Sequence, residues 1–328
     1  MIATMHAHQE KADLSDSSLC PVCSGRGEHH YTGRDFYFNL DRKYTYLRCV
    51  HCGACYQNPM PGEAEIAGYY PHNYAVHGTL KQRRGMSFYK KAVLKWTYGY
   101  AHIPVPDWYK PLGYAIGAFK YKDQVEFRHG GKALDIGCAN GKFLKYLGEL
   151  GWRIVGLDFS ENAVRACRSA GLEAYHGTVE SAGFETGCFD LITARHVIEH
   201  MRDPHAFARV VSRIVKTGGR LLIRTPNGAS LGRLLFGVHW YHNDIPRHLV
   251  LYPLDSLDLL FQQHGFTRKK AKTFSSSGNI TKSLQYAMGN HRRLHYFSRL
   301  LKILSKLYVP LSTGLGKGDE LFVVHEKR

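Results

Sequence analysis

The stretch that decides the fold is Ala133-Leu134-Asp135-Ile136-Gly137-Cys138-Ala139-Asn140-Gly141. A short apolar run ends in an acid, two glycines follow four residues apart, and a helical pattern begins at Lys142. This order predicts a strand, a tight turn and a helix, which together form the first unit of an open α/β sheet. Ligands of such sheets bind at the carboxyl ends of the strands, where glycine permits close approach and unusual backbone dihedrals.

Alternating strand and helix patterns continue downstream of this turn. Residues 152–158 form a second apolar run that ends in Asp158, where a carboxylate can accept the ribose hydroxyls of a nucleoside cofactor. Ser160 is a good cap for a helix at 161–170, and Asp203-Pro204 for another that we expect Gly218-Gly219 to end. Further strands are expected at 172–176, 189–194, 220–224, 266–274 and 320–325, and a further helix at 254–264.

Two C-x-x-C knuckles precede this domain. Cys20 and Cys23 are separated by 25 residues from Cys49 and Cys52, and paired knuckles at such a separation are typical of a tetrahedral Zn²⁺ site. The aromatic segment 31–47 between them suits the short strand pair of a zinc ribbon. Cys55 is an alternative to Cys52, and free or disulfide-bonded cysteines are the alternative to metal. Four thiolate ligands would make the zinc structural, because no position stays open for substrate.

The chain therefore predicts an α/β fold: a Rossmann-like, seven-stranded, mostly parallel sheet with helices on both faces, a small N-terminal zinc ribbon and helical cap insertions. We expect a flexible tail at residues 1–19, the zinc ribbon at 20–60 and a basic aromatic helical linker or cap at 61–130. The main domain then occupies 131–328, with insertions at 226–252 and 275–318.

The charge is strongly positive, at +17 from 44 basic and 27 acidic residues, which favours anionic partners. Nine basic residues and one acid lie between 81 and 122, and seven basic residues and no acid between 282 and 317. Both segments also carry aromatic or apolar residues, so they suit an anionic membrane surface, a single-stranded nucleic acid, or a cap packed on the main domain. Neither a signal peptide nor a run of about 20 apolar residues is present. We expect a cytoplasmic location, with peripheral contact at the inner membrane surface left open.

Several motifs stand in a fixed order, and they resemble the class I S-adenosylmethionine-dependent methyltransferases, within them the ubiquinone-biosynthesis-like branch. The motifs are the glycine turn at 134–141, Asp158, Phe189-Asp190, Val197-Ile198-Glu199-His200, Gly218-Gly219-Arg220 and Thr225-Pro226-Asn227. The knuckles with Asn58-Pro59, and the stretch Asp244-Ile245-Pro246-Arg247-His248-Leu249, resemble a bacterial subgroup that carries a zinc ribbon. The glycine turn also lacks the G-x-G-x-x-G spacing of a pyrophosphate site, which suits a cofactor without phosphates.

The resemblance implies S-adenosylmethionine as the cofactor. The glycine loop would approach its methionine part, Asp158 its ribose and Val179-Glu180 its adenine, while Asp135 would orient the loop and the methionine amine. The alternative is that both acids are simple turn formers at strand ends. The expected cofactor-binding residues are Asp135, Gly137, Cys138, Ala139, Gly141, Asp158, Phe159, Val179, Glu180 and Arg195.

Methyl transfer is an in-line displacement that needs proximity, and also a base if the acceptor is a hydroxyl or an acidic carbon. His196 ends the fourth strand beside the expected methyl group, so it is the first candidate for this base, with His200 and His248 as further catalytic candidates. The alternative for Glu199 and His200 is a structural role, in which they fix the start of a helix. The alternative for the insertion at 226–252 is a rigid lid that does not contact the acceptor. The candidate acceptor ligands in that insertion are His239, Tyr241, Asp244 and Arg247.

The leading interpretation is a histidine-assisted methyltransferase acting on a small-molecule, sugar or lipid-linked glycan acceptor. A nucleic-acid (RNA) methyltransferase is less favoured, because Thr193-Ala194-Arg195-His196 stands where amino-group methylation needs an Asn-Pro-Pro-aromatic motif. A non-catalytic binding or scaffold protein is disfavoured by the intact glycine turn and its acids. The sequence specifies neither the methylated atom nor the oligomeric state.

Overall fold

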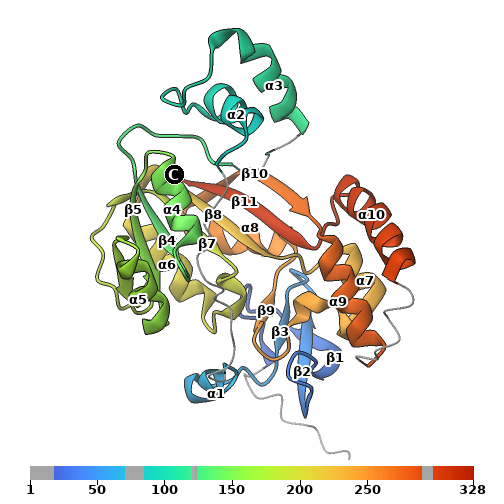
Figure 1. The fold of residues 1–328 in the computed structure, drawn as a ribbon. Coiled ribbons are helices and arrows are strands. Elements are labelled where there is room, and N and C mark those ends of the chain that lie inside the picture. Colours follow the sequence, from blue (N-terminus) through green and yellow to red (C-terminus); the bar gives the residue numbers. More distant parts are fainter. Residues whose placement is uncertain (1–17, 71–84, 120, 122–123, 290–297) are drawn as a thin grey trace, which may run out of the picture.

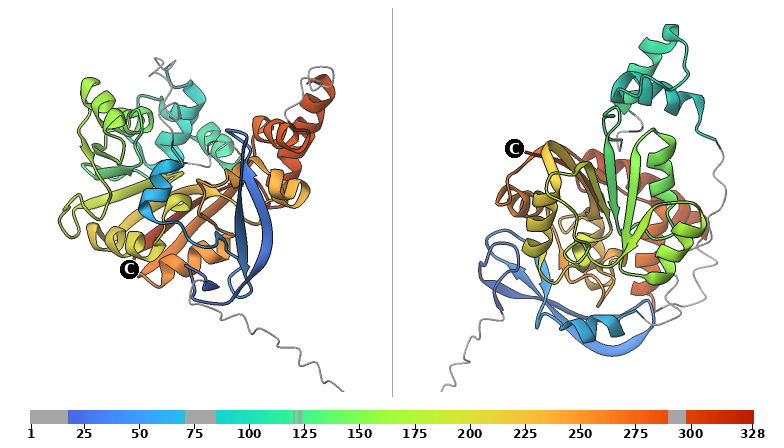
Figure 2. Two further views of the ribbon diagram at one scale, coloured as in Figure 1. Left: turned by 90° about the horizontal axis from the view of Figure 1, so that it is seen from below. Right: turned by 90° about the vertical axis from the view of Figure 1, so that its left-hand side faces the viewer.

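The computed structural model describes residues 18–70, 85–119, 121, 124–289 and 298–328 (Figure 1). Nearly all of the predicted N-terminal tail lies outside the described residues. A central sheet is flanked by helices, and a smaller sheet built mainly from the N-terminal segment lies against one end of it (Figures 1 and 2). None of the helices in the described part of the chain is long and apolar enough to cross a bilayer.

The central sheet has seven strands in the order β10-β11-β8-β7-β4-β5-β6. Strands β6, β5, β4, β7 and β8 are parallel, whereas β11 runs antiparallel to both of its neighbours. The chain order reverses between β4 and β7, which is where an open α/β sheet binds its ligand. The predicted fold class is confirmed. The strands are β4 (Lys132–Ile136), β5 (Arg153–Asp158), β6 (Ala174–His176), β7 (Phe189–Arg195), β8 (Val215–Pro226), β10 (Phe266–Phe274) and β11 (Glu320–Lys327).

Successive residues of the strands enter two different cores, as the pleat requires. In β4, Leu134 and Ile136 pack with helices α6 (Pro204–Ile214) and α8 (Leu254–Gln262), while Ala133 packs with α4 (Lys142–Glu149) on the other face. Helix α5 (Glu161–Ser169) packs beside α4 through a small third cluster. Helices therefore cover both faces of the sheet, and its carboxyl edge is left to the loops.

The two predicted helix starts are present, but one predicted helix end is wrong. The Ser160 side chain accepts from the Ala163 amide at 3.4 Å, and Asp203 accepts from the Ala206 amide at 2.9 Å. Helix α6 ends at Ile214 rather than at Gly218-Gly219. The reason is that Val215, which is β-branched and buried, takes an extended conformation and pairs with Phe189 of β7. Gly218, with φ +70°, instead lies within β8, where the pairing register with β7 shifts.

The N-terminal segment forms a sheet that the main domain completes. Strands β1 (Gly27–Asp35), β2 (Leu40–Cys49) and β3 (Cys55–Gln57) pair with β9 (Val250–Leu251) in the order β1-β2-β3-β9. The buried residues of this sheet, among them Tyr46 and Tyr56, belong to the same apolar core as helices α6 and α8. In Figure 2 the β1–β2 hairpin lies along the main domain. The N-terminal sheet is thus continuous with the main domain.

The remaining helices cap the domain. Helix α2 (Phe88–Tyr98) buries Ala92, Val93 and Leu94 in the core on the α4 face of the sheet, as expected for a packed cap. It pairs with α3 (Lys110–Phe119), and together they project from one end of the molecule (Figure 1). The other short helices are α1 (Glu63–Gly68), η2 (Asp107–Tyr109) and η3 (Ile198–His200). The insertions contain α7 (Leu231–Phe236), η4 (Gly237–His239), η5 (Tyr241–Asn243), α9 (Ser277–Ala287) and α10 (Ser298–Gly314).

Candidate active site

The turn after β4 has a backbone that only glycine-rich sequence can adopt. Gly137, Ala139 and Gly141 have φ values of +70°, +51° and +75°. A Cβ on Gly137 would lie 2.6 Å from Cγ2 of Val197, so the turn also packs directly against the segment after β7. The amides of Gly137 and Cys138 both donate to the Leu157 carbonyl, at 2.8 and 3.1 Å. The turn is therefore fixed at the switch point of the sheet before any ligand binds.

Two carboxylates border this turn. Asp158 Oδ2 accepts from the Ala139 amide at 2.8 Å, and Oδ1 accepts from the Ser160 amide at 2.9 Å. Asp158 thus does act as a turn former, yet its oxygens have further lone pairs for ribose hydroxyls. Asp135 is buried and accepts a 2.6 Å hydrogen bond from Thr193 Oγ1. Burial raises the pKa of Asp135 to about 6, although the Thr193 hydrogen bond and the Arg195 charge oppose this.

The other predicted cofactor residues lie around the same edge. Cys138 and Val179 are buried, Glu180 is exposed, and the Phe159 side chain is 66% exposed just beyond β5. The Arg195 guanidinium lies 4.2 Å from the ring centroid of Phe143. A nucleoside cofactor that carries an ammonium group and no phosphate would fit this edge. The features that match it are the glycine turn, the carboxylates of Asp135 and Asp158, and the exposed ring of Phe159. These residues could therefore hold S-adenosylmethionine, although their individual roles stay predictions.

His196 follows β7 in a strained conformation, with φ +56°. A non-glycine residue in this region is held there by its surroundings, and here its amide donates to the Arg224 carbonyl at 2.7 Å. Its Nδ1 lies 3.2 Å from Oε1 of Glu199, which is fully buried and also accepts from Thr225 Oγ1 at 2.9 Å. Burial opposes ionisation of Glu199, yet the His196 hydrogen bond and the nearby histidines hold its pKa at about 2.

Three further residues that sequence reasoning missed surround His196. Glu320, the first residue of β11, lies 3.9 Å from His196 Nε2, 3.8 Å from His242 Nε2, and in an ion pair with Arg224. Burial lowers the pKa of His242 to about 3, so this ring is neutral. An antiparallel last strand brings its first residues to the carboxyl edge of the parallel strands. The signal available in the sequence was the Asp319-Glu320 pair, which follows an acid-free segment at 275–318.

A second cluster combines Glu199 with His200 and His248. One ligand atom from each lies within 4.8 Å of the others, so the three could hold a metal ion. The Nδ1 atom of His200 lies 2.9 Å from both the Tyr70 hydroxyl and the Arg247 carbonyl, and Nδ1 of His248 lies 2.8 Å from the His242 carbonyl. In each ring Nε2 is therefore the nitrogen left for a metal or a proton. Burial lowers the pKa of His248 to about 4.

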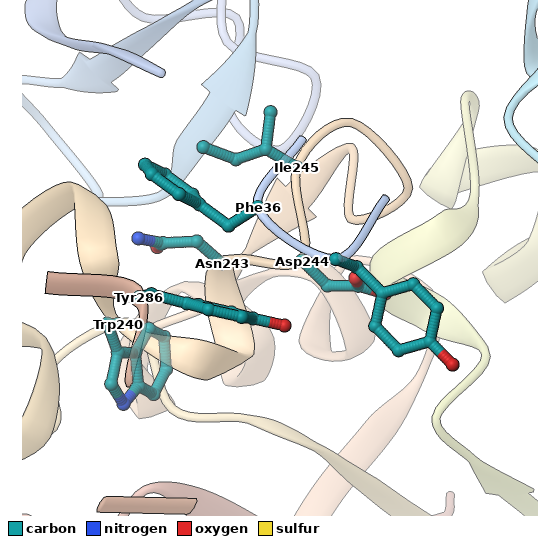
Figure 3. Close-up of a pocket in the computed structure, with 7 residues that line it drawn as sticks. Phe36, Trp240, Asn243, Asp244, Ile245 and Tyr286 are labelled. Carbon is teal, nitrogen blue, oxygen red and sulfur yellow. The ribbon is translucent and has the colours of Figure 1, made fainter. Parts of the chain in front are cut away.

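The predicted acceptor residues are mostly engaged elsewhere. Arg247 is buried, and its guanidinium binds the carboxylates of Asp35 and Asp244, so the structure favours the rigid-lid alternative over acceptor contact. His239 packs on Phe36 with ring centroids 4.9 Å apart, and the Tyr241 hydroxyl accepts from Lys282 at 2.9 Å. Figure 3 shows a small pocket where these segments meet. Its cavity volume is about 10 Å³. It is lined by Phe36, Tyr37, Trp240, Asn243, Asp244, Ile245 and Tyr286.

The four predicted zinc ligands come together in the structure. The sulfur atoms of Cys20 and Cys52 lie 3.6 Å apart and those of Cys23 and Cys49 3.4 Å apart, and all four lie within 4.8 Å of one another. A tetrahedral ion with Zn–S bonds of about 2.3 Å would set its sulfurs about 3.8 Å apart. This cluster fits zinc. Cys55, the alternative ligand, is fully buried in β3 and is not part of the cluster.

Comparisons with known proteins agree with this geometry. Residues 119–269 match a family model described as a methyltransferase domain. The ubiquinone biosynthesis O-methyltransferase of Xanthomonas oryzae pv. oryzae is 29% identical over 127 residues, which cover 36% of this chain and 53% of that protein. The protein of the same description from Methylococcus capsulatus is 31% identical over 127 residues, covering 36% and 54%. The chain spans about half the length of the curated relatives that it matches.

Among solved structures, an S-adenosylmethionine-dependent methyltransferase from Mesorhizobium loti is similar to 65% of this chain, over 98% of its own length. The TM-score is 0.44 and the sequence identity 16%. The family model, the sheet order and the glycine turn with its two carboxylates all point the same way. Residues 119–269 therefore match a methyltransferase domain, and the comparisons support a class I S-adenosylmethionine-dependent methyltransferase fold that is similar to the ubiquinone-biosynthesis type.

Proposed function

We propose that this protein transfers a methyl group from S-adenosylmethionine to a hydroxyl oxygen of a small-molecule acceptor. The observation that carries this proposal is the His196–Glu199 pair beside the glycine turn. Val197, the residue after His196, is the side chain that a Cβ on Gly137 would meet. The candidate base and the cofactor turn are therefore neighbours, as an in-line displacement requires.

His196 is the general base in this proposal. Its Nδ1–H would donate to Glu199, so Nε2 is the nitrogen that would take the proton of an acceptor hydroxyl. The side chain is 39% exposed, which leaves room for an acceptor to approach. The low pKa of Glu199 keeps it ionised, and its negative charge stabilises the imidazolium that forms when the proton arrives. S-adenosylmethionine, when bound, supplies a methyl group on an already activated sulfonium.

The remaining roles follow from position. Asp135 would receive the methionine ammonium, Asp158 the ribose hydroxyls, and the exposed face of Phe159 the adenine side of the cofactor. The four clustered cysteines would hold a structural zinc ion with no open position. The cofactor assignment rests on carboxylates at strand ends, which can bind an amine and a diol. The zinc assignment rests on four thiolates, which suit a soft ion in tetrahedral coordination.

The acceptor class is the finer part of the proposal. The matched relatives are named O-methyltransferases of ubiquinone biosynthesis, so a hydroxyl on a lipophilic ring is the first acceptor to test. A sugar or lipid-linked glycan is the second, because it offers the same reacting group, a hydroxyl whose proton His196 can remove.

Contact with an anionic membrane is supported by the orientation of helix α10. Two leucines in its described part face outward, with Leu307 65% and Leu311 56% exposed, whereas Ser305 and Ser312 are buried against the domain. Lys306 and Lys317 are exposed beside them, and segment 275–318 contains no acid. Outward leucines with flanking lysines suit a lipid surface. We expect co-sedimentation with anionic vesicles at low salt, lost in the Leu307→Ser/Leu311→Ser variant; absence of binding by the wild type would oppose this part of the proposal.

Methyl transfer is tested with radiolabelled methyl groups. The zinc-loaded protein is incubated with methyl-tritiated S-adenosylmethionine and a panel of phenolic, sugar and isoprenoid-linked hydroxyl compounds. We expect label on at least one acceptor. The His196→Ala variant should lose turnover at least a hundredfold while its cofactor affinity changes less than twofold. A matched control is His29→Ala, which removes an exposed ribbon histidine. Unchanged turnover in His196→Ala would remove His196 as the base.

A further inference from the structure

We propose that the zinc ribbon positions the catalytic segment, through a buried clasp made of Asp35, Arg247 and Asp244. Arg247 is then a positioning residue, and the ribbon is a working part of the active site rather than an appended module. The inference rests on the proposed function only in taking Glu199, His200 and His248 as part of the site. The clasp itself is defined by contacts that exist without cofactor or acceptor.

The ribbon side of the clasp is Asp35, the last residue of β1. Its carboxylate accepts two hydrogen bonds from Arg247, at 2.7 and 3.1 Å, and it is 2% exposed. Oδ1 of the same carboxylate also accepts from the amides of Tyr37 and Phe38, both at 2.9 Å, which closes the β1–β2 hairpin. The position of Arg247 is therefore set by the tip of the ribbon hairpin.

The main-domain side is Asp244, whose Oδ1 accepts from Nε and Nη2 of Arg247 at 3.0 and 2.8 Å. Asp244 adopts φ +33°, so its backbone is held in the left-handed region where the clasp needs it. The Phe36 and Asp244 side chains both line the pocket of Figure 3, which lies at this join. One guanidinium thus bridges two carboxylates that belong to segments more than 200 residues apart.

The backbone of residues 247–249 links the clasp to the candidate catalytic residues. The Arg247 carbonyl lies 2.9 Å from Nδ1 of His200, and the Leu249 amide donates to the Glu199 carbonyl at 2.7 Å. Glu199 in turn holds His196 through its side chain. His200 is therefore one hydrogen bond and His196 two hydrogen bonds away from residues 247–249, and His248 is itself one of these residues.

The ribbon also holds the far side of the same backbone. The Tyr46 hydroxyl donates to the His248 carbonyl at 3.0 Å, and the Gln57 amide donates to the Leu249 carbonyl at 2.9 Å. Residues 247–249 lie between η5 and β9 and form no helix or strand of their own. Their order therefore depends on the ribbon on one side and on the Glu199–His200 segment on the other.

The experiment compares clasp variants by hydrogen–deuterium exchange on the full-length, metal-loaded chain without acceptor. In Asp35→Asn and Arg247→Met we expect the Leu249 and His200 amides to exchange at least tenfold faster. The amides of the 137–141 turn should stay unchanged, and the dissociation constant for S-adenosylmethionine should stay within twofold. Arg247→Lys keeps the positive charge but lacks the guanidinium that binds two carboxylates at once. Its Leu249 and His200 amides should therefore exchange at rates between those of the wild type and Arg247→Met.

The matched control is Asp41→Asn, which breaks the exposed Arg34–Asp41 pair of the same hairpin and should leave all these amides unchanged. Nitrogen-15 spectra of histidine side chains add a readout for positioning. The His200 tautomer signal should change in Asp35→Asn, because its Nδ1 partner is the Arg247 carbonyl. Cobalt substitution verifies a folded ribbon through its thiolate absorption; should Arg247→Met not fold, Asp35→Asn and Arg247→Lys carry the test.

Unchanged exchange at Leu249 and His200 in the folded clasp variants would overturn the proposal. So would faster exchange that spreads equally to the 137–141 turn, because it would reduce the clasp to general stability. Neither result depends on detecting methyl transfer, so failure of this inference is distinguishable from failure of the proposed function.

Discussion

The proposed cofactor side and the proposed acceptor side of the site are built in different ways. On the cofactor side, the Ala139 amide and Asp158 are 19 residues apart, and Thr193 and Asp135 are 58 apart. On the acceptor side, Tyr70 and His200 are 130 residues apart, Tyr46 and His248 are 202 apart, and Asp35 and Arg247 are 212 apart. The first side is made of consecutive strand ends, and the second is assembled from three distant parts of the chain.

This difference implies that the two sides can be damaged separately. We expect that loss of a contact in the glycine turn removes cofactor binding and leaves the ribbon intact. We expect that loss of the ribbon disorders the acceptor side and leaves the turn after β4 in place, because that turn is hydrogen-bonded to β5.

Removal of the metal has the largest expected effect and tests this separation directly. Structural zinc sites contribute about 10–16 kcal/mol in isolated peptides, and the ribbon shares its apolar core with the main domain. Chelation, or the Cys20→Ser/Cys23→Ser variant, should lower the melting temperature strongly and expose the 244–251 amides to exchange. Cofactor affinity should change far less. Calorimetry and hydrogen–deuterium exchange check this prediction. An equal loss of cofactor affinity and of order at residues 244–251 would contradict the comparison.

The Gly137→Val variant attacks the cofactor side alone. It forces a β-branched residue to φ +70° and places its Cβ 2.6 Å from the Val197 side chain. We expect at least a hundredfold weaker S-adenosylmethionine binding, which is about 3 kcal/mol. Gly171→Val is the control, because Gly171 also has a positive φ, at +75°, but no atom lies within 4 Å of its added Cβ. Similar losses in both variants would place the effect in general backbone strain.

Acid unfolding probes the acceptor side through Glu199. Its pKa in the folded protein is about 2, below the usual 4.5. The stabilisation is therefore present above pH 4.5 and is lost as the pH falls toward 2, and it amounts to about 3 kcal/mol. Urea unfolding at pH 6 and pH 3 should show that the wild type loses more than half of this contribution while Glu199→Gln does not. A pH dependence that is the same in both proteins would remove Glu199 as an ionised group.

The pH dependence of cofactor binding gives the smallest effect. The pKa of Asp135 is raised to about 6, and the methionine ammonium needs the ionised carboxylate. The dissociation constant should stay constant above pH 6 and rise below it by at most about tenfold per pH unit, which is about 1.4 kcal/mol. The Asp135→Asn variant should bind S-adenosylmethionine weakly, and its dissociation constant should not depend on pH in this range. Calorimetric titrations between pH 5 and 8 measure both, and a slope retained in Asp135→Asn would assign it to another group.

The same division explains what the sequence could predict. Asp135, Gly137, Gly141 and Asp158 follow strand patterns that local periodicity reveals, and the structure places them together at one sheet edge. The four clustered cysteines were readable because knuckle spacing is a local signal as well. The seven-stranded, mostly parallel sheet also followed from the strand patterns and motifs.

The acceptor side could not be read in this way. The pairing of β9 with β3, the role of Asp35, and the approach of Glu320 and His242 to His196 all depend on packing between distant segments. Arg247 was predicted as an acceptor ligand because the sequence does not show that its guanidinium binds two buried carboxylates. The end of α6 was misjudged because pairing of Val215 with β7 outweighed a glycine pair that looked like a stop signal.

The most direct test of the central claim is a calorimetric titration of S-adenosylmethionine into the wild-type protein and the Asp158→Ala variant. The account predicts one binding site per chain in the wild type and at least tenfold weaker binding in Asp158→Ala, because Asp158 supports both the turn and the ribose. A wild-type protein that does not bind, or a variant that binds as tightly as the wild type, would contradict it.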